Sequence, residues 1–221
     1  MGTPILLFRL EGVLQSWGER SKWDYRDTAD FPSKSGVIGL LSCALGLERD
    51  DPEIARMNRE LSMVVRADRP GELIVDYHTI STEMLLNAEG KRRAGAGTIV
   101  SHRSYLQDAS FLVGISGEKM LLEKLKTALD APVWQVYLGR KSCVPSIPVI
   151  GKLTEEYCSL WEAMENEPLQ TRHADHILAE IETIEAEGRL RADVTIGNRS
   201  FQNRRVAVRT IMAKEAEYDS D

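Results

Sequence analysis

The chain has 221 residues, of which 43% are hydrophobic and 28% charged, a composition typical of a soluble globular protein. No apolar run reaches the ~20 residues that a membrane-spanning helix needs. The N-terminal stretch lacks the basic region and cleavage site of a signal peptide, so we expect a cytoplasmic protein with no membrane partner. Three widely spaced cysteines indicate neither a disulfide framework nor a zinc site, and we expect no metal and no cofactor.

The net charge of −6 argues against a nucleic-acid-binding protein unless the charge is unevenly distributed. Residues 153–221 carry 8 basic and 15 acidic side chains, which accounts for the whole deficit. A basic surface therefore remains compatible with the first two-thirds of the chain. The acidic end is typical of a solvated surface, or of one that faces a basic partner.

The N-terminal segment indicates a strand followed by an aromatic and basic turn. Residues 4–10 are short and apolar, as in a central strand. Trp17, Tyr25 and Arg26 follow, and aromatic side chains interleaved with cations can stack on bases beside phosphates. The alternative is that Trp17 packs beneath a loop.

Residues 31–51 indicate a buried helix with a polar N-terminus. Apolar side chains recur at helical spacing after Pro32, and Gly46 is suited to the C-terminus. Ser33, Lys34 and Ser35 stand where free backbone N–H groups and the positive end of the helix dipole favour an anion. The alternative is a capped core helix with a solvated lysine.

The next elements indicate strands interrupted by a long basic segment. Residues 54–59 favour a short helical turn, and 61–67 and 73–79 alternate as half-buried strands do. Residues 80–104 then contain Lys91, Arg92 and Arg93 among glycines, with little to bury. Such a segment can follow a phosphate backbone, or it can be an ordinary solvated loop.

Residues 109–115 indicate a central strand and 117–129 a second amphipathic helix. The order strand, helix, strand, strand, helix favours a ferredoxin-like βαββαβ fold. Residues 137–143 then form a polar loop that combines an aromatic ring, a glycine, two cations and a hydroxyl: Tyr137, Gly139, Arg140, Lys141 and Ser142. This loop is suited to holding a phosphate, although a surface turn has similar composition.

Beyond residue 152 the pattern is weaker. Residues 154–167 favour a helix, 177–187 fit a helix and a strand equally, and 206–212 favour a strand. The last residues, 215–221, indicate an acidic tail.

Five motifs in order resemble the CRISPR-associated RAMP superfamily, in particular the family of CasD subunits of type I-E Cascade complexes. They comprise residues 8–18, 31–51, 76–79, 105–111 and 137–143. The resemblance covers residues 4–150 well and the remainder weakly. It implies an α+β, RRM-like RAMP domain over residues 1–150, with a β-hairpin thumb at about 80–104. It also implies that residues 151–221 form an irregular or β extension packed on the same domain.

The resemblance implies a non-catalytic subunit that clamps the 5′ handle of the crRNA in antiviral defence. Its implied partners are this RNA, the backbone and large Cascade subunits and, indirectly, the target DNA. The RNA-binding residues expected from the motifs and the resemblance are Trp17, Arg26, Ser33, Lys34, Ser35, Lys91, Arg92, Arg93, His102, Arg103, Tyr137, Gly139, Arg140, Lys141 and Ser142.

Two other classes of function are compatible with parts of the sequence. A metal-independent endoribonuclease that processes repeat RNA needs a group titrating near neutrality, and His102 with Tyr105 is the best candidate pair. The sequence has no phosphate-binding G-x-x-x-x-G-K-[ST] loop, no H-E-x-x-H motif and no G-x-S-x-G motif. Their absence favours the non-catalytic RNA-binding subunit over an enzyme. A pure assembly protein would leave Arg103, Arg140 and Lys141 without a role.

Overall fold

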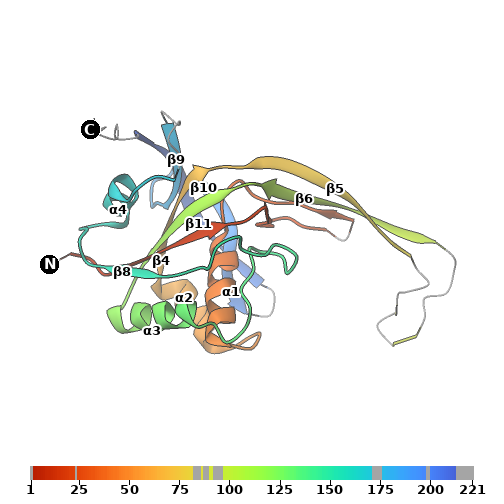
Figure 1. The fold of residues 1–221 in the computed structure, drawn as a ribbon, viewed down its shortest axis with the longest axis horizontal. Coiled ribbons are helices and arrows are strands. Elements are labelled where there is room, and N and C mark those ends of the chain that lie inside the picture. The colour runs from red at the N-terminus through yellow and green to blue at the C-terminus, as the bar shows by residue number, and fades with distance from the viewer. Residues whose placement is uncertain are drawn as a thin grey trace, which may run out of the picture.

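A seven-stranded antiparallel sheet, in the order β10-β11-β9-β4-β7-β1-β8, forms the centre of the fold (Figure 1). It is seen in a computed structural model, which describes residues 2–22, 24–81, 86, 90–91, 97–170, 176–197 and 200–212. The strands are β1 (Ile5–Glu11), β4 (Ser62–Arg69), β7 (Ser110–Ser116), β8 (Lys152–Thr154), β9 (His176–Glu182), β10 (Arg189–Gly197) and β11 (Ser200–Met212).

Helices cover both faces of this sheet. The helices α1 (Lys34–Leu45), α2 (Pro52–Glu60) and α3 (Lys119–Asp130) lie on one face, and α4 (Leu160–Asn166) lies on the other (Figure 1). The alternation of β1 explains this arrangement, because Leu6, Phe8 and Leu10 enter the larger hydrophobic core. Ile5 and Leu7 enter a smaller core beneath α4. No helix within the described ranges is long and apolar enough to cross a membrane.

A second sheet of four strands carries a long hairpin away from the body of the molecule (Figure 1). Its strands are β2 (Leu14–Gln15), β3 (Tyr25–Arg26), β5 (Glu72–Ser81) and β6 (Thr98–Gln107). The arms β5 and β6 pair from Glu72 opposite Gln107 to Ser81 opposite Thr98. The hairpin is therefore longer than the predicted span of 80–104.

The prediction that residues 73–79 form a strand of the central fold is wrong in its placement. These residues lie in β5, which pairs with β6 and not with the seven-stranded sheet. Their alternating pattern is that of a hairpin arm, and Leu73, Val75 and Tyr77 are more than half exposed. The place beside β4 is taken by β7.

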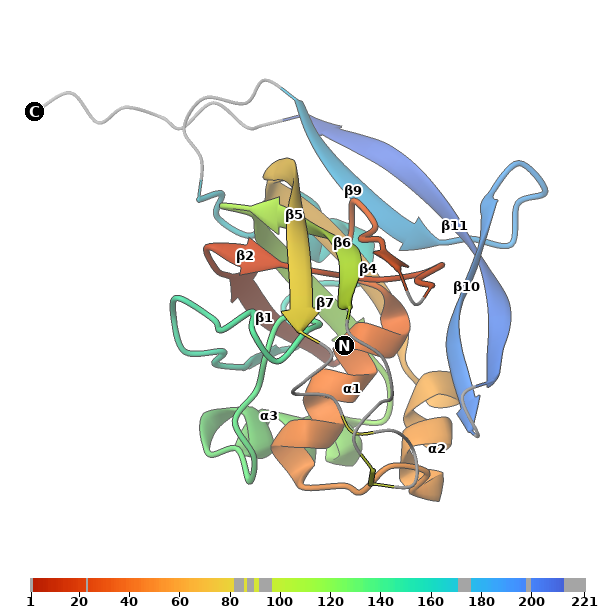
Figure 2. The same cartoon turned by 90° about the vertical axis from the view of Figure 1, so that its right-hand side faces the viewer.

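The C-terminal third of the chain is joined to the same sheet. Strand β9 pairs with β4, and β11 pairs with both β9 and β10. Residues 177–187, which fitted helix and strand equally, contain most of β9, and the predicted strand 206–212 is the end of β11. Strand β10 was not predicted. Figure 2 shows β10 and β11 curving toward α2 and α1.

Candidate nucleic-acid interface

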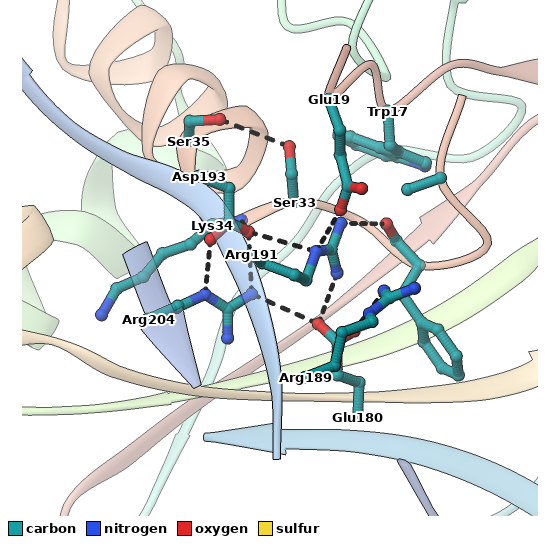
Figure 3. Close-up of polar contacts among 12 residues, drawn as sticks. Trp17, Glu19, Ser33, Lys34, Ser35, Glu180, Arg189, Arg191, Asp193 and Arg204 are labelled. Carbon is teal, nitrogen blue, oxygen red and sulfur yellow. Dashed lines mark hydrogen bonds and ion pairs between the residues drawn. The ribbon is translucent and has the colours of Figure 1, made fainter. Parts of the chain in front are cut away.

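The N-terminus of α1 is occupied by the chain's own carboxylates (Figure 3). Ser33 caps the helix by accepting a hydrogen bond from the Gly36 N–H. The backbone N–H of Lys34 donates to Asp193 Oδ2 at 2.8 Å, and Lys34 Nζ lies 2.9 Å from Glu182 Oε1. Lys34 is 5% exposed, and the Ser35 hydroxyl lies beside that of Ser33.

These contacts correct the prediction that Ser33, Lys34 and Ser35 bind an RNA phosphate. The helix end does attract an anion, as its dipole and free N–H groups require, but the anion is the carboxylate of Asp193. Lys34 is buried and paired, so it is not a solvated lysine either.

A network of buried ion pairs holds Asp193 in this position (Figure 3). Arg204 donates to Asp193 from Nε at 2.7 Å and from Nη2 at 2.9 Å, and Nη2 also lies 3.2 Å from Glu180 Oε1. Arg191 pairs with Glu180 and Glu19. Burial alone would raise the pKa of Asp193, but hydrogen bonds and charge from Arg204, and the charge of Arg191, hold it below its usual value.

Trp17 is a core residue. Its side chain is 1% exposed, and the indole Nε1–H donates to Gln15 Oε1 at 3.1 Å. The prediction that Trp17 stacks on an RNA base is therefore wrong for this conformation, because no face of the ring is open to a ligand. The alternative, a tryptophan packed beneath a loop, is what the structure contains.

The loop containing Gly139 packs against the segment that follows β2. Gly139 has a φ of +87°, and a Cβ at this position would lie 1.8 Å from the carbonyl oxygen of Ser16. The Ser16 N–H donates to the Leu138 carbonyl. Glycine is thus required for a close approach of two backbone segments, and not for the predicted approach of RNA. In the same loop Tyr137 is half-buried, and Lys141 and Ser142 are exposed.

Arg140 connects three separate segments of the chain. Its Nη1 donates to the Ser104 carbonyl at 3.1 Å, and its Nη2 donates to the carbonyls of Arg26 at 3.0 Å and Asp27 at 3.2 Å. The guanidinium carbon lies 4.7 Å from the centre of the Tyr105 ring, a cation–π contact. Most of the hydrogen-bonding capacity of Arg140 is thus used within the protein, and its predicted contact with a phosphate stays a prediction.

Three arginines nevertheless gather at this point. Strand β3 pairs with β6 so that Arg26 lies opposite Arg103, and Arg140 reaches the backbone beside both. Arg26 is exposed, and Arg103 is half-buried with its Nε donating to Ser101 Oγ at 3.3 Å. We call Arg26, Arg103 and Arg140 the arginine cluster. It is the part of the predicted site that the structure brings together.

The two residues considered for catalysis lie apart. His102 and Tyr105 are three positions apart in β6, so their side chains point to opposite faces of the strand. Tyr105 is 7% exposed beneath Arg140, whereas His102 is exposed and contacts the Tyr77 ring, with 5.5 Å between ring centres. The alternative pair His102 and Tyr105 is therefore not assembled as one acid–base site.

The predicted basic tip of the hairpin falls largely outside the described residues. Lys91 is described and exposed, whereas Arg92 and Arg93 lie outside the described ranges. Sequence reasoning also missed the buried charges of the C-terminal strands, Glu180, Arg191 and Asp193, and their partner Arg204, whose side chain is 8% exposed. The signal available was the spacing of Arg189, Arg191 and Asp193, which places three charges on one face of a strand.

Comparison with known proteins places the chain in a family. Residues 5–212 match the family described as CRISPR-associated protein (Cas_Cas5), and the chain belongs to this family. It is a homologue of the CRISPR system Cascade subunit CasD of Escherichia coli (strain K12), with 35% identity over 156 residues, or 65% of this chain and 68% of that protein.

Two solved structures share the fold. A chain of a structure titled "CRISPR RNA-guided surveillance complex" superposes with a TM-score of 0.75 and 33% identity, over 96% of this chain and 91% of that one. A "Crystal structure of Cas protein" gives a TM-score of 0.72 and 36% identity, over 96% of this chain and all of that one. The mixed α+β fold, with four helices and two sheets in its described part, is therefore that of this family.

Proposed function

We propose that this chain is the CasD-type subunit of a type I-E Cascade complex and that it holds the 5′ handle of the crRNA without cleaving it. The observation that carries the proposal is the likeness, over 96% of the chain, to a subunit of an RNA-guided surveillance complex. The arginine cluster supplies a chemical reason, since Arg26 is exposed, Arg103 is half-buried, and guanidinium groups favour phosphates.

Within the proposed fold, residues 1–150 form a ferredoxin-like RAMP domain with β5 and β6 as its thumb. The strand order β4-β7-β1-β8 supports this assignment, because α1 follows β1 and α3 follows β7, as in a βαββαβ unit. Residues 151–221 form an extension of the same domain, which the pairing of β9 with β4 supports.

In the proposed mechanism, the protein holds the RNA by positioning charged side chains and does no chemistry on it. Arg140 fixes the backbone of Arg26 relative to β6, so that Arg26 and Arg103 present their charges from adjacent strands. A single RNA strand lying across β3 and β6 would meet both charges. Clamping requires no proton transfer. The partners of the complete assembly are the other Cascade subunits and, through them, the target DNA.

The test is a binding experiment with an oligonucleotide of the crRNA 5′ handle and, separately, an unprocessed repeat RNA. We expect the handle to be retained and both RNAs to stay intact in the presence of EDTA. His102→Ala should leave the RNA intact as well. Metal-free cleavage by the wild-type chain that disappears in His102→Ala would favour the endoribonuclease instead.

A further inference from the structure

The β5–β6 hairpin has two chemically different faces. Register partners share a face of a sheet, so Tyr25 of β3, His102 of β6 and Tyr77 of β5 form one row across three strands. The adjacent residues Arg26, Arg103 and Asp76 form the corresponding row on the other side. The formal charges of the three strands are thereby segregated.

The row of rings belongs to a side of the sheet that carries no formal charge; it is exposed along β5, whereas Ser104 and Leu106 of β6 are buried. The register places the following residues of β3, β5 and β6 on this side, none of them Lys, Arg, Asp or Glu: Tyr25, Leu73, Val75, Tyr77, Thr79, Ser81, Thr98, Val100, His102, Ser104 and Leu106. We call this side the uncharged face. The formal charges Glu72, Asp76, Arg103 and Arg26 all belong to the other side.

Large apolar side chains on the uncharged face are left in water. Leu73 is 64% exposed, Val75 53%, Tyr77 62% and Tyr25 49%. Contiguous exposed apolar side chains on a soluble chain indicate a binding surface. A depletion of charge with an enrichment of tyrosine is typical of the centre of a protein–protein interface.

The exposed edge of β5 adds a second feature. Among the described residues β5 pairs with β6 alone, so the backbone groups along its other edge have no strand beside them. A ten-residue edge strand is a template for a further strand, whose alternate side chains would continue the same face.

We propose that the uncharged face and the free edge of β5 dock an extended segment of a neighbouring protein subunit. The segment is apolar at alternate positions, which lie beside Leu73, Val75 and Tyr77. The distribution of charge favours a protein segment over RNA on this face. An RNA backbone needs cations, and Arg26 and Arg103 belong to the opposite face. The inference rests on the proposed function in that it takes the chain to be a subunit of a larger complex. The hairpin then lies between RNA on one side and protein on the other.

The test compares the double variant Val75→Lys/Tyr77→Lys with a control that adds two lysines elsewhere, Met120→Lys/Ile150→Lys. The control residues are 72% and 61% exposed, and Met120 lies on α3. Each chain is co-expressed with the other subunits of its complex and the crRNA, and incorporation is measured by native mass spectrometry. We expect the double variant to enter the complex at least about tenfold less than the wild type, because docking would bury two unpaired ammonium groups. The control should enter like the wild type.

Two further measurements make the outcome specific. The isolated double variant should keep its unfolding midpoint and its affinity for the 5′-handle oligonucleotide. Amide hydrogen exchange along β5 should slow in the assembled complex and not on adding RNA alone, which is the signature of a newly paired edge.

Several results would overturn the proposal. It fails if the double variant is incorporated as well as the wild type, or if the double variant binds the handle tenfold more weakly, which would make this an RNA surface. It also fails if the isolated wild-type chain self-associates through this face and the β5 amides stay unprotected in the complex. If the wild-type chain itself does not enter the complex, that result contradicts the proposed function and not the docking surface alone.

Discussion

Arg140 donates hydrogen bonds to the backbone carbonyls of Ser104, Arg26 and Asp27, so removing its side chain changes both the protein and the proposed RNA site. We expect Arg140→Ala to lower the free energy of unfolding by about 1–2 kcal/mol, because half-exposed carbonyls lose a charged donor. It should also weaken RNA binding by releasing Arg26. Urea unfolding and RNA titration measure the two effects. Lys141→Ala, in the same loop but exposed, should leave unfolding unchanged. Equal unfolding of wild type and Arg140→Ala would contradict the bridging role.

Arg26 and Arg103 are the residues from which we expect a direct phosphate contact. Replacing either with alanine should reduce the slope of log affinity against log salt by roughly 0.7, the value for one contact on a single strand. The control is Arg59→Ala, an exposed arginine at the end of α2. Salt slopes that stay at the wild-type value in both variants would mean that these side chains do not meet RNA phosphates.

At the scale of elements, the carboxylate of Asp193 attaches β10 to the N-terminus of α1. Asp193→Asn keeps the shape but removes the charge between Arg204 and Arg191, and should lower the free energy of unfolding at pH 7 by about 3 kcal/mol, as expected for breaking a buried ion pair. Asp130→Asn, at the exposed end of α3, should cost less than about 1 kcal/mol.

The pH dependence of this difference follows from the lowered pKa of Asp193. A carboxyl with a folded-state pKa below its unfolded value of about 3.9 contributes stability above that value and loses it as the pH falls through the folded-state pKa. The gap between wild type and Asp193→Asn should therefore be largest at neutral pH and shrink below about pH 4. Urea unfolding at several pH values measures it. A gap that is constant down to pH 3 would contradict the charged role of Asp193.

Gly139 attaches the loop 137–143 to the segment after β2. Gly139→Ala puts a Cβ against the Ser16 carbonyl at a φ of +87°, so we expect a loss of about 2 kcal/mol or more in unfolding free energy. RNA affinity should fall as well, because Arg140 is the next residue. Gly39→Ala is the control, since Gly39 lies in α1 with open space around it, and should stabilise by about 0.5–1 kcal/mol. Equal stability of Gly139→Ala and wild type would contradict the packing role.

The elements that sequence reasoning predicted well are those set by local periodicity. Residues 31–51 contain α1 with Ser33 as its N-cap and Gly46 at its C-terminus, and 117–129 contain most of α3. Placement across the sheet was less predictable. The alternation of 73–79 identifies a strand, but its partner depends on long-range register, which alternation does not encode.

The site was predictable in residue type and less so in role. A lysine and two serines at a helix start favour an anion, but the partner, Asp193, stands 159 residues further along the chain and belongs to a strand that was not predicted. Arg140 and Gly139 were chosen for a phosphate, yet their contacts are to carbonyls and to the Ser16 backbone. Whether such a residue contacts a ligand or the protein itself depends on how deeply the fold buries it, and burial is set by the whole chain.

At the scale of the whole molecule, the negative net charge comes from the acidic C-terminal third of the chain. Its carboxylates at Glu180, Glu182 and Asp193 pair with buried cations, including Lys34. These three acidic groups are therefore neutralised by ion pairs within the protein. Because the excess of acidic side chains lies in residues 153–221, the first two-thirds of a chain with a net charge of −6 can still present a local basic surface.

We propose that this subunit holds the 5′ end of the crRNA and leaves it uncut. The most direct measurement follows one labelled repeat RNA, carrying the 5′ handle sequence, through incubation with the purified chain in EDTA. We expect the RNA to be retained with an affinity that falls as salt rises, and to be recovered at full length. Recovery of a shortened RNA, or an affinity for the handle no greater than for an unrelated RNA of equal length, would contradict it.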